Sequence, residues 1–519
     1  MKKVFKVIFI YLGVALLALL ATIIFCAAFL FFYREGNIFG IKYISTSEYI
    51  QARDDEDMSG LKSIEITGDS FDIYIKSYDG IGSVVGVMYN KVFGFAKSSE
   101  AQAEFSLEYD EVNKVAQFSS VQPSGWLNKS KSYIEIGVPK TLAETGIDLV
   151  VISKKADILI GGETDFVINN IIVESIKGDV ELTNTCINNQ IDINIGSGLL
   201  YVDDKCSTAG KIDLNISLGS GKINFTKVNR DNFNIKSVKI NSIKSGQIGV
   251  LKADELISDG NINGGGRIEI GEVGVVDFLS LDTDLSIVNL LKTEGNSSRI
   301  VITGHGDVWI DTVMCDLMVN GNNGSVYIRS ALGVVDVETN KGNINIDMAD
   351  NLVQVNTVDG DAVIKFNPDA LEHNPDLDSV SNNYRKVIAT TQNGHIKVYE
   401  VQNATVQATN AGKVTLEYDR VVGQNVILTQ SGSVYIVVPK AQKLDDSHAF
   451  NLQLSSQVNS DIKVGIVGSL GDVQYEVNFN GKSETFNDIY NSGTGTENDL
   501  IINSTYGLIK VRSEDLINY

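Results

Sequence analysis

A glycine followed by alternating polar and apolar residues recurs along most of this chain of 519 residues. In the most regular block the glycines lie 18 residues apart, at Gly306, Gly324, Gly342 and Gly360. Related units begin at Gly178, Gly198, Gly221, Gly246, Gly394, Gly412 and Gly432. A unit this short has an apolar face that it cannot bury alone, so consecutive units must stack to enclose a common core.

Each unit predicts two short strands. The second and fourth residues after the glycine are apolar, as at Val308 and Ile310, and a second alternating segment contains Leu317 and Val319. A turn of 18 to 23 residues suits one coil of a parallel β-solenoid, in which neighbouring strands lie about 4.8 Å apart. Glycine suits the corners because it tolerates positive φ and has little bulk. The alternative is a series of hairpins that close into antiparallel sandwiches, but the near-identical spacing favours the solenoid.

We therefore predict a mostly β chain, with an N-terminal transmembrane helix followed by an elongated, single-chain parallel β-solenoid. The expected parts are a cytoplasmic tip and transmembrane anchor (1–33), a linker (34–60), a β module (61–145), the repeat β-solenoid (146–440) and a C-terminal β cap (441–519). The cap is expected because the open end of a solenoid is an adhesive sheet edge. The polar stretch near 367–386 predicts a protruding loop.

The amino-terminal segment predicts a membrane anchor. Residues 7–33 carry no charge and are long enough to cross a bilayer as a tilted helix. No convincing Ala-x-Ala cleavage site follows, so we expect the helix to stay on the protein. The charges near the span are Lys2, Lys3 and Lys6 before it and Arg34, Lys42 and Arg53 after it. The two sides carry equal numbers of basic residues, and the cluster at the amino terminus gives a weak preference for placing that terminus inside the cell. We therefore expect the body outside the cytoplasm, and a body that stays in the cytosol is the alternative.

Charge and composition exclude several classes of ligand. With 65 acidic and 43 basic residues the net charge is −22, which argues against nucleic acid as a partner. The chain has four histidines, His305, His373, His395 and His448. They show neither the spacing of metal ligands nor the arrangement of a nucleophile and its base. We expect no cofactor, no metal and no catalytic residue.

Two cysteines occupy the same phase of the repeat. Cys186 lies eight residues after Gly178, and Cys206 lies eight residues after Gly198. Adjacent coils would bring their Cα atoms close to the separation that a disulfide needs, so this pair is the disulfide candidate. A pair of stacked buried thiols is the alternative. Cys315 has no partner in phase.

Trp309 and Tyr327 are expected to project outward at one position in neighbouring coils, with Asp307 and Asp311 nearby. Such a group resembles a platform on which a sugar ring could stack, so these four are the candidate binding residues. In the alternative interpretation the two rings are a cross-strand pair that stabilises the sheet surface.

Aspartates are dense in the middle of the chain. They are Asp259, Asp277, Asp282, Asp284, Asp307 and Asp311. Polysaccharide lyases and hydrolases need clustered carboxylates together with a basic residue. These aspartates share no single phase of the repeat, so we do not expect an enzyme.

The chain resembles the bacterial putative-adhesin domain family. The resemblance is carried by the segment 133–140 (YIEIGVPK) and by Gly-Asp-Val at Gly178 and Gly306, and it covers about residues 61–519. It implies a membrane-tethered, outward-facing β-solenoid in a bacterial envelope, and it transfers no catalytic residues. We accordingly expect a single-pass binding protein for surface attachment or envelope interaction, with a cell-wall glycan or surface protein as ligand. The alternative is an envelope stress or regulatory component that binds a partner protein, and a polysaccharide lyase or hydrolase is less favoured.

Overall fold

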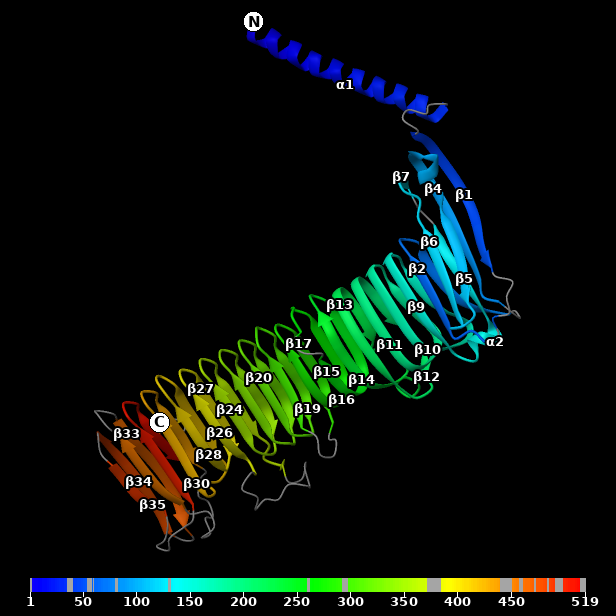
Figure 1. Ribbon diagram of the computed structural model, residues 1–519. Coiled ribbons are helices and arrows are strands. Elements are labelled where there is room, and N and C mark those ends of the chain that lie inside the picture. The colour runs from blue at the N-terminus through cyan, green and yellow to red at the C-terminus, as the bar shows by residue number, and fades with distance from the viewer. Residues whose placement is uncertain are drawn as a thin grey trace. The chain divides into compact units, whose positions relative to one another are not determined.

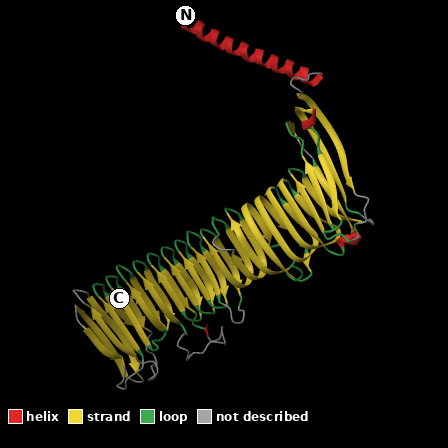
Figure 2. Ribbon diagram, viewed as in Figure 1, coloured by secondary structure: helices red, strands yellow, loops and turns green. Residues whose placement is uncertain are grey.

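The computed structural model describes residues 2–34, 41–53, 58, 60–79, 83–128, 132–258, 262–291, 297–370, 384–438, 450–456, 461–470, 473–482, 485–490 and 498–513. The chain separates into two compact units, Met1–Ala209 and Gly210–Tyr519. Beyond one long helix, most of the described residues are in strands (Figure 2). Most of the loop predicted near 367–386 lies outside the described residues, whereas strand β1 (Ile41–Arg53) occupies much of the segment predicted as a linker, 34–60.

The N-terminal unit contains one long helix, two single helical turns and a set of strands. In chain order the described elements are α1 (Lys2–Arg34), β1 (Ile41–Arg53), β2 (Ser63–Gly68), β3 (Asp72–Tyr78), β4 (Val85–Lys97), η1 (Ser98–Glu100), β5 (Glu104–Asp110), β6 (Val115–Val121), β7 (Trp126–Asn128), β8 (Tyr133–Pro139), α2 (Lys140–Ala143), β9 (Ile147–Lys155), β10 (Ile158–Lys177), β11 (Val180–Val202) and β12 (Ser207–Thr208).

Helix α1 is apolar over its whole middle. The 19 residues Tyr11–Phe29 are long and apolar enough to cross a membrane, and none of this span is buried in the structure. A signal sequence has the same properties, so the helix by itself does not show that the protein stays anchored.

The strands of the N-terminal unit pair in both senses. Antiparallel pairs join β1 to β4, β4 to β7 and β8, and β5 to β6. Parallel pairs join β2 to β6 and β9, β3 to β8 and β10, and β10 to β9 and β11. The antiparallel hairpins thus give way to a parallel stack within this unit. Apolar residues at alternate positions, such as Ile64 and Ile66 of β2, form its buried core.

The C-terminal unit consists of strands. They are β13 (Lys211–Phe225), β14 (Asn234–Ile243), β15 (Gln247–Ser258), β16 (Arg267–Ser280), β17 (Asp284–Leu290), β18 (Ser298–Ile302), β19 (Val308–Val313), β20 (Leu317–Gly321), β21 (Val326–Ala331), β22 (Val335–Thr339), β23 (Ile344–Ala349), β24 (Val353–Thr357), β25 (Ala362–Phe366), β26 (Lys386–Thr391), β27 (His395–Val401), β28 (Asn403–Ala408), β29 (Lys413–Tyr418), β30 (Gln424–Thr429), β31 (Val434–Val438), β32 (Phe450–Ser456), β33 (Asp461–Leu470), β34 (Val473–Lys482), β35 (Thr485–Tyr490), β36 (Asp499–Ser504) and β37 (Ile509–Ser513).

Successive repeats of this unit pair in parallel and form two ladders (Figure 1). The first ladder runs β17–β19–β21–β23–β25–β27–β29–β31–β37. The second runs β18–β20–β22–β24–β26–β28–β30–β36. Each repeat therefore adds one strand to each ladder, which is consistent with a parallel β-solenoid and contradicts a series of antiparallel hairpins.

The apolar positions of the repeat line the interior. In the first ladder Val308 and Ile310 are buried, and in the second ladder Leu317 and Val319 are buried. Equivalent positions in the following repeats are buried in the same way, because the register between repeats keeps each apolar residue over the previous one. The core is thus a continuous stack of aliphatic side chains.

The glycines form a column in which backbones touch. A Cβ on Gly342 would overlap the carbonyl oxygen of Gly324, and a Cβ on Gly324 would overlap that of Gly306. Close approach is the constraint at these three positions, because positive φ is confined to other glycines, such as Gly178 and Gly198 at 144° and 151°. Absence of a side chain therefore matters more than backbone freedom in the regular block.

The turns before Gly342, Gly360, Gly394 and Gly507 are each held by a hydroxyl side chain three residues earlier. The N–H of Gly342 donates to Oγ1 of Thr339 at 2.9 Å, and the N–H of Gly360 donates to Oγ1 of Thr357 at 3.0 Å. Both threonines are almost fully buried. A buried hydroxyl thus satisfies a backbone donor that the corner would otherwise leave without an acceptor.

The polar position after each glycine also joins neighbouring repeats. The N–H of Ser325 donates to the Asp307 carboxylate at 2.7 Å, and the N–H of Asp361 donates to the Asn343 side-chain oxygen at 3.0 Å. A side chain in one repeat therefore accepts a hydrogen bond from the backbone of the next repeat. This role explains why Asp and Asn recur at the position, beyond the need to keep like charges apart.

The last two described strands, β36 and β37, continue the two ladders. Strands β36 and β37 pair in parallel with β30 and β31, and Gly507 continues the glycine column on Gly432. Strands β32 and β33, which come earlier in the sequence, pair on the far side of β36 and β37. They are followed in space by the antiparallel strands β35 and β34. The order of strands in space thus differs here from their order in sequence.

Candidate binding surface

Trp309 and Tyr327 lie side by side on the outer face of the first ladder. They are register partners in β19 and β21, their ring centroids are 5.1 Å apart, and their planes are inclined at 41°. Half of the Trp309 surface is exposed. Ser286 and Asn345 flank the pair in the neighbouring strands, so the two rings form an isolated aromatic step on a polar sheet.

Charged side chains border this aromatic pair. Arg329 of β21 forms an ion pair with Asp311 of β19, in which Nη2 and Oδ2 are 2.8 Å apart. The Tyr327 hydroxyl donates to Asp347, and this bond to a carboxylate raises the pKa of Tyr327. Asn345 donates to the same carboxylate at 2.8 Å. Arg329 and Asp347 were not predicted from the sequence. Arg329 lies two residues after Tyr327 in β21, and Asp347 lies two residues after Asn345, the register partner of Tyr327, in β23.

The two carboxylates predicted beside the rings have separate roles. Asp311 pairs with Arg329 next to the rings. Asp307 lies at the turn, where it accepts the Ser325 N–H, and its own N–H donates to Asp284 at 2.9 Å. The structure thus brings Trp309, Tyr327 and Asp311 together on one face, while Asp307 joins neighbouring repeats.

The other aspartates of the dense region are largely structural. Asp282 accepts the N–H of His305 at 2.9 Å, and Asp277 is the register partner of Arg299. Asp259 lies outside the described residues.

The structure describes two of the four histidines, His305 and His395. His395 contacts the Thr415 hydroxyl through Nε2 at 2.8 Å, and burial followed by the Lys397 charge lowers its pKa. His373 and His448 lie outside the described residues. Within the described ranges, no three His, Cys, Asp or Glu side chains come together as a metal site.

The two cysteines of the predicted disulfide lie close together but are one residue out of register, with Cys186 in β11 and Cys206 immediately before β12. Cys186 of β11 pairs with Ser207 of β12, the residue that follows Cys206. Both cysteines are free thiols in the structure. The Cys206 thiol donates to the carbonyl of Leu182 at 3.3 Å, and burial raises its pKa to about 12. The disulfide stays a prediction.

A hollow of about 450 Å³ opens in the N-terminal unit beside Asp72, Lys155, Asp157 and Lys177. The N–H of Asp157 donates to Asp72 at 3.2 Å, and the N–H of Asp179 donates to Asp157 at 2.9 Å. Burial raises the pKa of Asp72. These aspartates repeat the inter-strand hydrogen bond described for Asp307, so the hollow is lined by groups that already hold the stack together.

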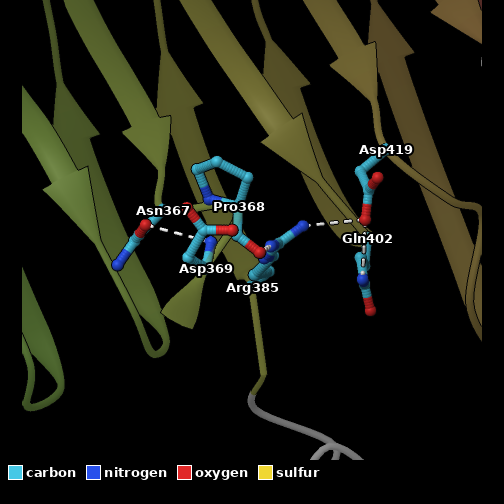
Figure 3. A network of polar contacts seen from close by, with 6 residues as sticks. All are labelled: Asn367, Pro368, Asp369, Arg385, Gln402 and Asp419. Carbon is cyan, nitrogen blue, oxygen red and sulfur yellow. Dashed lines mark hydrogen bonds and ion pairs between the residues drawn. The ribbon is translucent and has the colours of Figure 1, made fainter. Parts of the chain in front are cut away.

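Arg385 forms a buried network that the sequence analysis missed (Figure 3). Its side chain is 3% exposed, and Nη1 donates to Oδ2 of Asp419 at 2.7 Å. Nη2 donates to the carbonyl oxygen of Pro368, which lies before the interruption in the repeat spacing. Gln402 donates to the same Asp419 oxygen at 3.0 Å. Arg385 thus joins three consecutive repeats at the point where their spacing is interrupted.

The backbone around this network departs from ordinary strand geometry. Arg385 has φ 42° and Glu400 has φ 58°, values that non-glycine residues rarely adopt. Burial, followed by the charge of Asp419, raises the pKa of Glu400. The network therefore places a buried cation beside two residues with strained backbone, at the point where the repeat spacing is interrupted, and we interpret it as structural.

Comparison with known proteins gives only remote likeness to solved structures. No known protein-family model matches the chain, and no curated protein matches it either. Among solved structures it is similar to a "putative cell adhesion protein" from Clostridium sporogenes, with 8% sequence identity and a TM-score of 0.14, over 91% of this chain and 100% of that chain. These values are too low to assign a function, so the resemblance to the putative-adhesin domain family stays a prediction.

Proposed function

We propose that this chain is a membrane-anchored binding protein whose body, an elongated parallel β-solenoid, stands outside the cytoplasm. It would act by adhesin-like surface attachment or by interaction with the cell envelope, without catalysis. The observation that carries this proposal is the pairing of Trp309, which is 50% exposed, with the partly buried Tyr327 on the outer sheet face. An exposed aromatic step of this kind can stack against a flat apolar surface such as the face of a sugar ring.

The polar groups beside the rings support binding of a polyhydroxylated ligand. Arg329 offers guanidinium donors and Asp347 offers carboxylate acceptors at the edge of the pair. Repetition of the β units would also present several contact sites along one face, so weak individual contacts could combine.

Removal of the aromatic pair is expected to weaken glycan binding. Changing Trp309→Ser and Tyr327→Ser together removes two apolar contacts that contribute at least about 1.5 kcal/mol, which corresponds to roughly tenfold weaker binding. The measurement is binding of purified cell-wall glycan fragments by calorimetry. Tyr435→Ser is the matched control, because Tyr435 is 39% exposed at the same ladder position between Thr415 and Lys510. If the unchanged protein, the double variant and Tyr435→Ser bind the glycan equally, the aromatic pair has no part in binding.

The location of the body is tested by protease treatment of intact cells that carry a C-terminal tag on the full chain. We expect loss of the tag without lysis, because the charges around residues 7–33 place the amino terminus inside the cell. Lysed cells serve as the control for protease sensitivity. If the tag survives until the cytoplasmic membrane itself is opened, the body is cytosolic and the proposal is wrong.

A further inference from the structure

The sheet that follows helix α1 carries an exposed aromatic face at one end. Tyr43 of β1 pairs with Phe95 of β4, and Phe95 pairs with Trp126 of β7. Cross-strand partners and residues two apart share a face of a sheet, so Phe93 lies on this face as well. Trp126 is 87% exposed and Phe93 is 39% exposed. We call Tyr43, Phe93, Phe95 and Trp126 the aromatic tip.

Basic residues accompany these rings. Lys97, the register partner of Ile41, is exposed on the same face as the rings, and Lys42, the register partner of Ala96, is exposed on the opposite face at the same end of the sheet. The described stretches Ile41–Ser47 and Lys91–Lys97 contain no acidic residue, although the chain as a whole carries a net charge of −22. Exposed Trp, Phe and Tyr beside Lys is the composition found where proteins meet the membrane–water interface.

The chain holds this tip close to helix α1. The helix ends at Arg34 and β1 begins at Ile41. An extended residue spans at most about 3.6 Å, so the start of β1 lies within about 25 Å of the helix end. Phe29 of the helix also contacts Phe95, with ring centroids 5.9 Å apart. If α1 crosses the membrane, the aromatic tip is within reach of the headgroup layer on the side where the helix emerges.

We propose that the aromatic tip rests in the headgroup layer of the membrane that α1 crosses, with its rings at the acyl boundary and its lysines toward lipid phosphates. This inference rests on the anchoring proposed above. It gives the body a second contact with the bilayer, through an apolar face that water would otherwise cover. Each lysine near an anionic surface adds attraction of its own.

The test uses the fact that the chain has two tryptophans, Trp126 and Trp309. The full chain with Trp309→Phe reports on Trp126 alone, and the full chain with Trp126→Phe reports on Trp309 alone. Each protein is placed in nanodiscs of neutral and anionic phospholipid, with or without lipids that carry a quencher near the headgroup. Both faces of a nanodisc are open to solvent, so orientation does not affect the result.

Labelled lipid is expected to reduce Trp126 emission about twofold, because a ring at headgroup depth contacts the labelled lipids directly. Aqueous iodide should quench Trp126 weakly and Trp309 strongly. If iodide reaches Trp126 and labelled lipid does not, in protein that co-elutes with the discs, the tip does not contact lipid and the anchor still stands. Shielding of Trp126 from both quenchers would place protein on the tip and overturn the inference. Failure to co-elute with the discs would contradict the anchor itself, and the inference with it.

Discussion

Replacing Arg385 by leucine is expected to lower the local free energy of unfolding by about 2–4 kcal/mol. Loss of one partner from a buried ion pair costs about 3–5 kcal/mol, and the partial exposure of Asp419 reduces this value. The change also leaves the Pro368 carbonyl without its guanidinium donor. The stretch affected should be β26 and β28, because Arg385 immediately precedes the first and contacts residues on both sides of the second.

Hydrogen exchange of the β26 and β28 amides is the appropriate measurement, because a stacked chain of this size need not unfold in a single step. Arg329→Leu is the matched control, since it removes an Arg–Asp pair whose side chains are 57% and 42% exposed. That change should alter local stability by less than about 1 kcal/mol. If the β26 amides exchange no faster in Arg385→Leu than in Arg329→Leu, Arg385 does not stabilise the contact between these repeats.

Gly342→Ala is expected to destabilise the neighbouring repeats by about 3 kcal/mol, at the upper end of the effects of overpacking. The new methyl group would overlap the carbonyl oxygen of Gly324, which belongs to the backbone and cannot rotate away. The two repeats must therefore separate, and the parallel pairing of β21 with β23 should weaken. Limited proteolysis and hydrogen exchange at these strands would measure the effect.

The control for this change is Gly321→Ala in the same block. A Cβ at Gly321 would lie 3.7 Å from its nearest neighbour, which is ordinary van der Waals contact. Because Gly321 does not have positive φ, alanine fits without backbone strain. Near-equal stability of the Gly342→Ala and Gly321→Ala proteins would show that the glycine column is not a packing constraint.

The parallel ladders were predictable because the same chemistry recurs at a constant interval. Equal spacing places Val308, Val326 and Ile344 at one position of the stack, and alternation then decides which side chains face inward. The outward pairing of Trp309 with Tyr327 follows from the same register. Local pattern and fold agree in these repeats, so sequence reasoning is sufficient for them.

The Arg385 network could not be predicted in this way. Its partners Pro368 and Asp419 lie 17 and 34 residues away, across an interruption of the repeat. Its inward direction also depends on a φ of 42°, which alternation does not indicate. The register at Cys186 and Cys206 also differs from simple counting, because equal distances from two glycines do not guarantee that two residues are direct partners. The irregular spacing in that region shifts the partner by one position, to Ser207.

The strand order at the end of the stack has a consequence for synthesis of the protein. A chain that emerges from its amino terminus can add each strand to the growing ladders as it appears, up to β30 and β31. The strands that next pair with these two are β36 and β37, the last described in the sequence. Strands β32 and β33 need β36 and β37 as their parallel partners. Completion of the stack must therefore wait until β36 and β37 have left the ribosome, and until then β30 and β31 remain open strand edges.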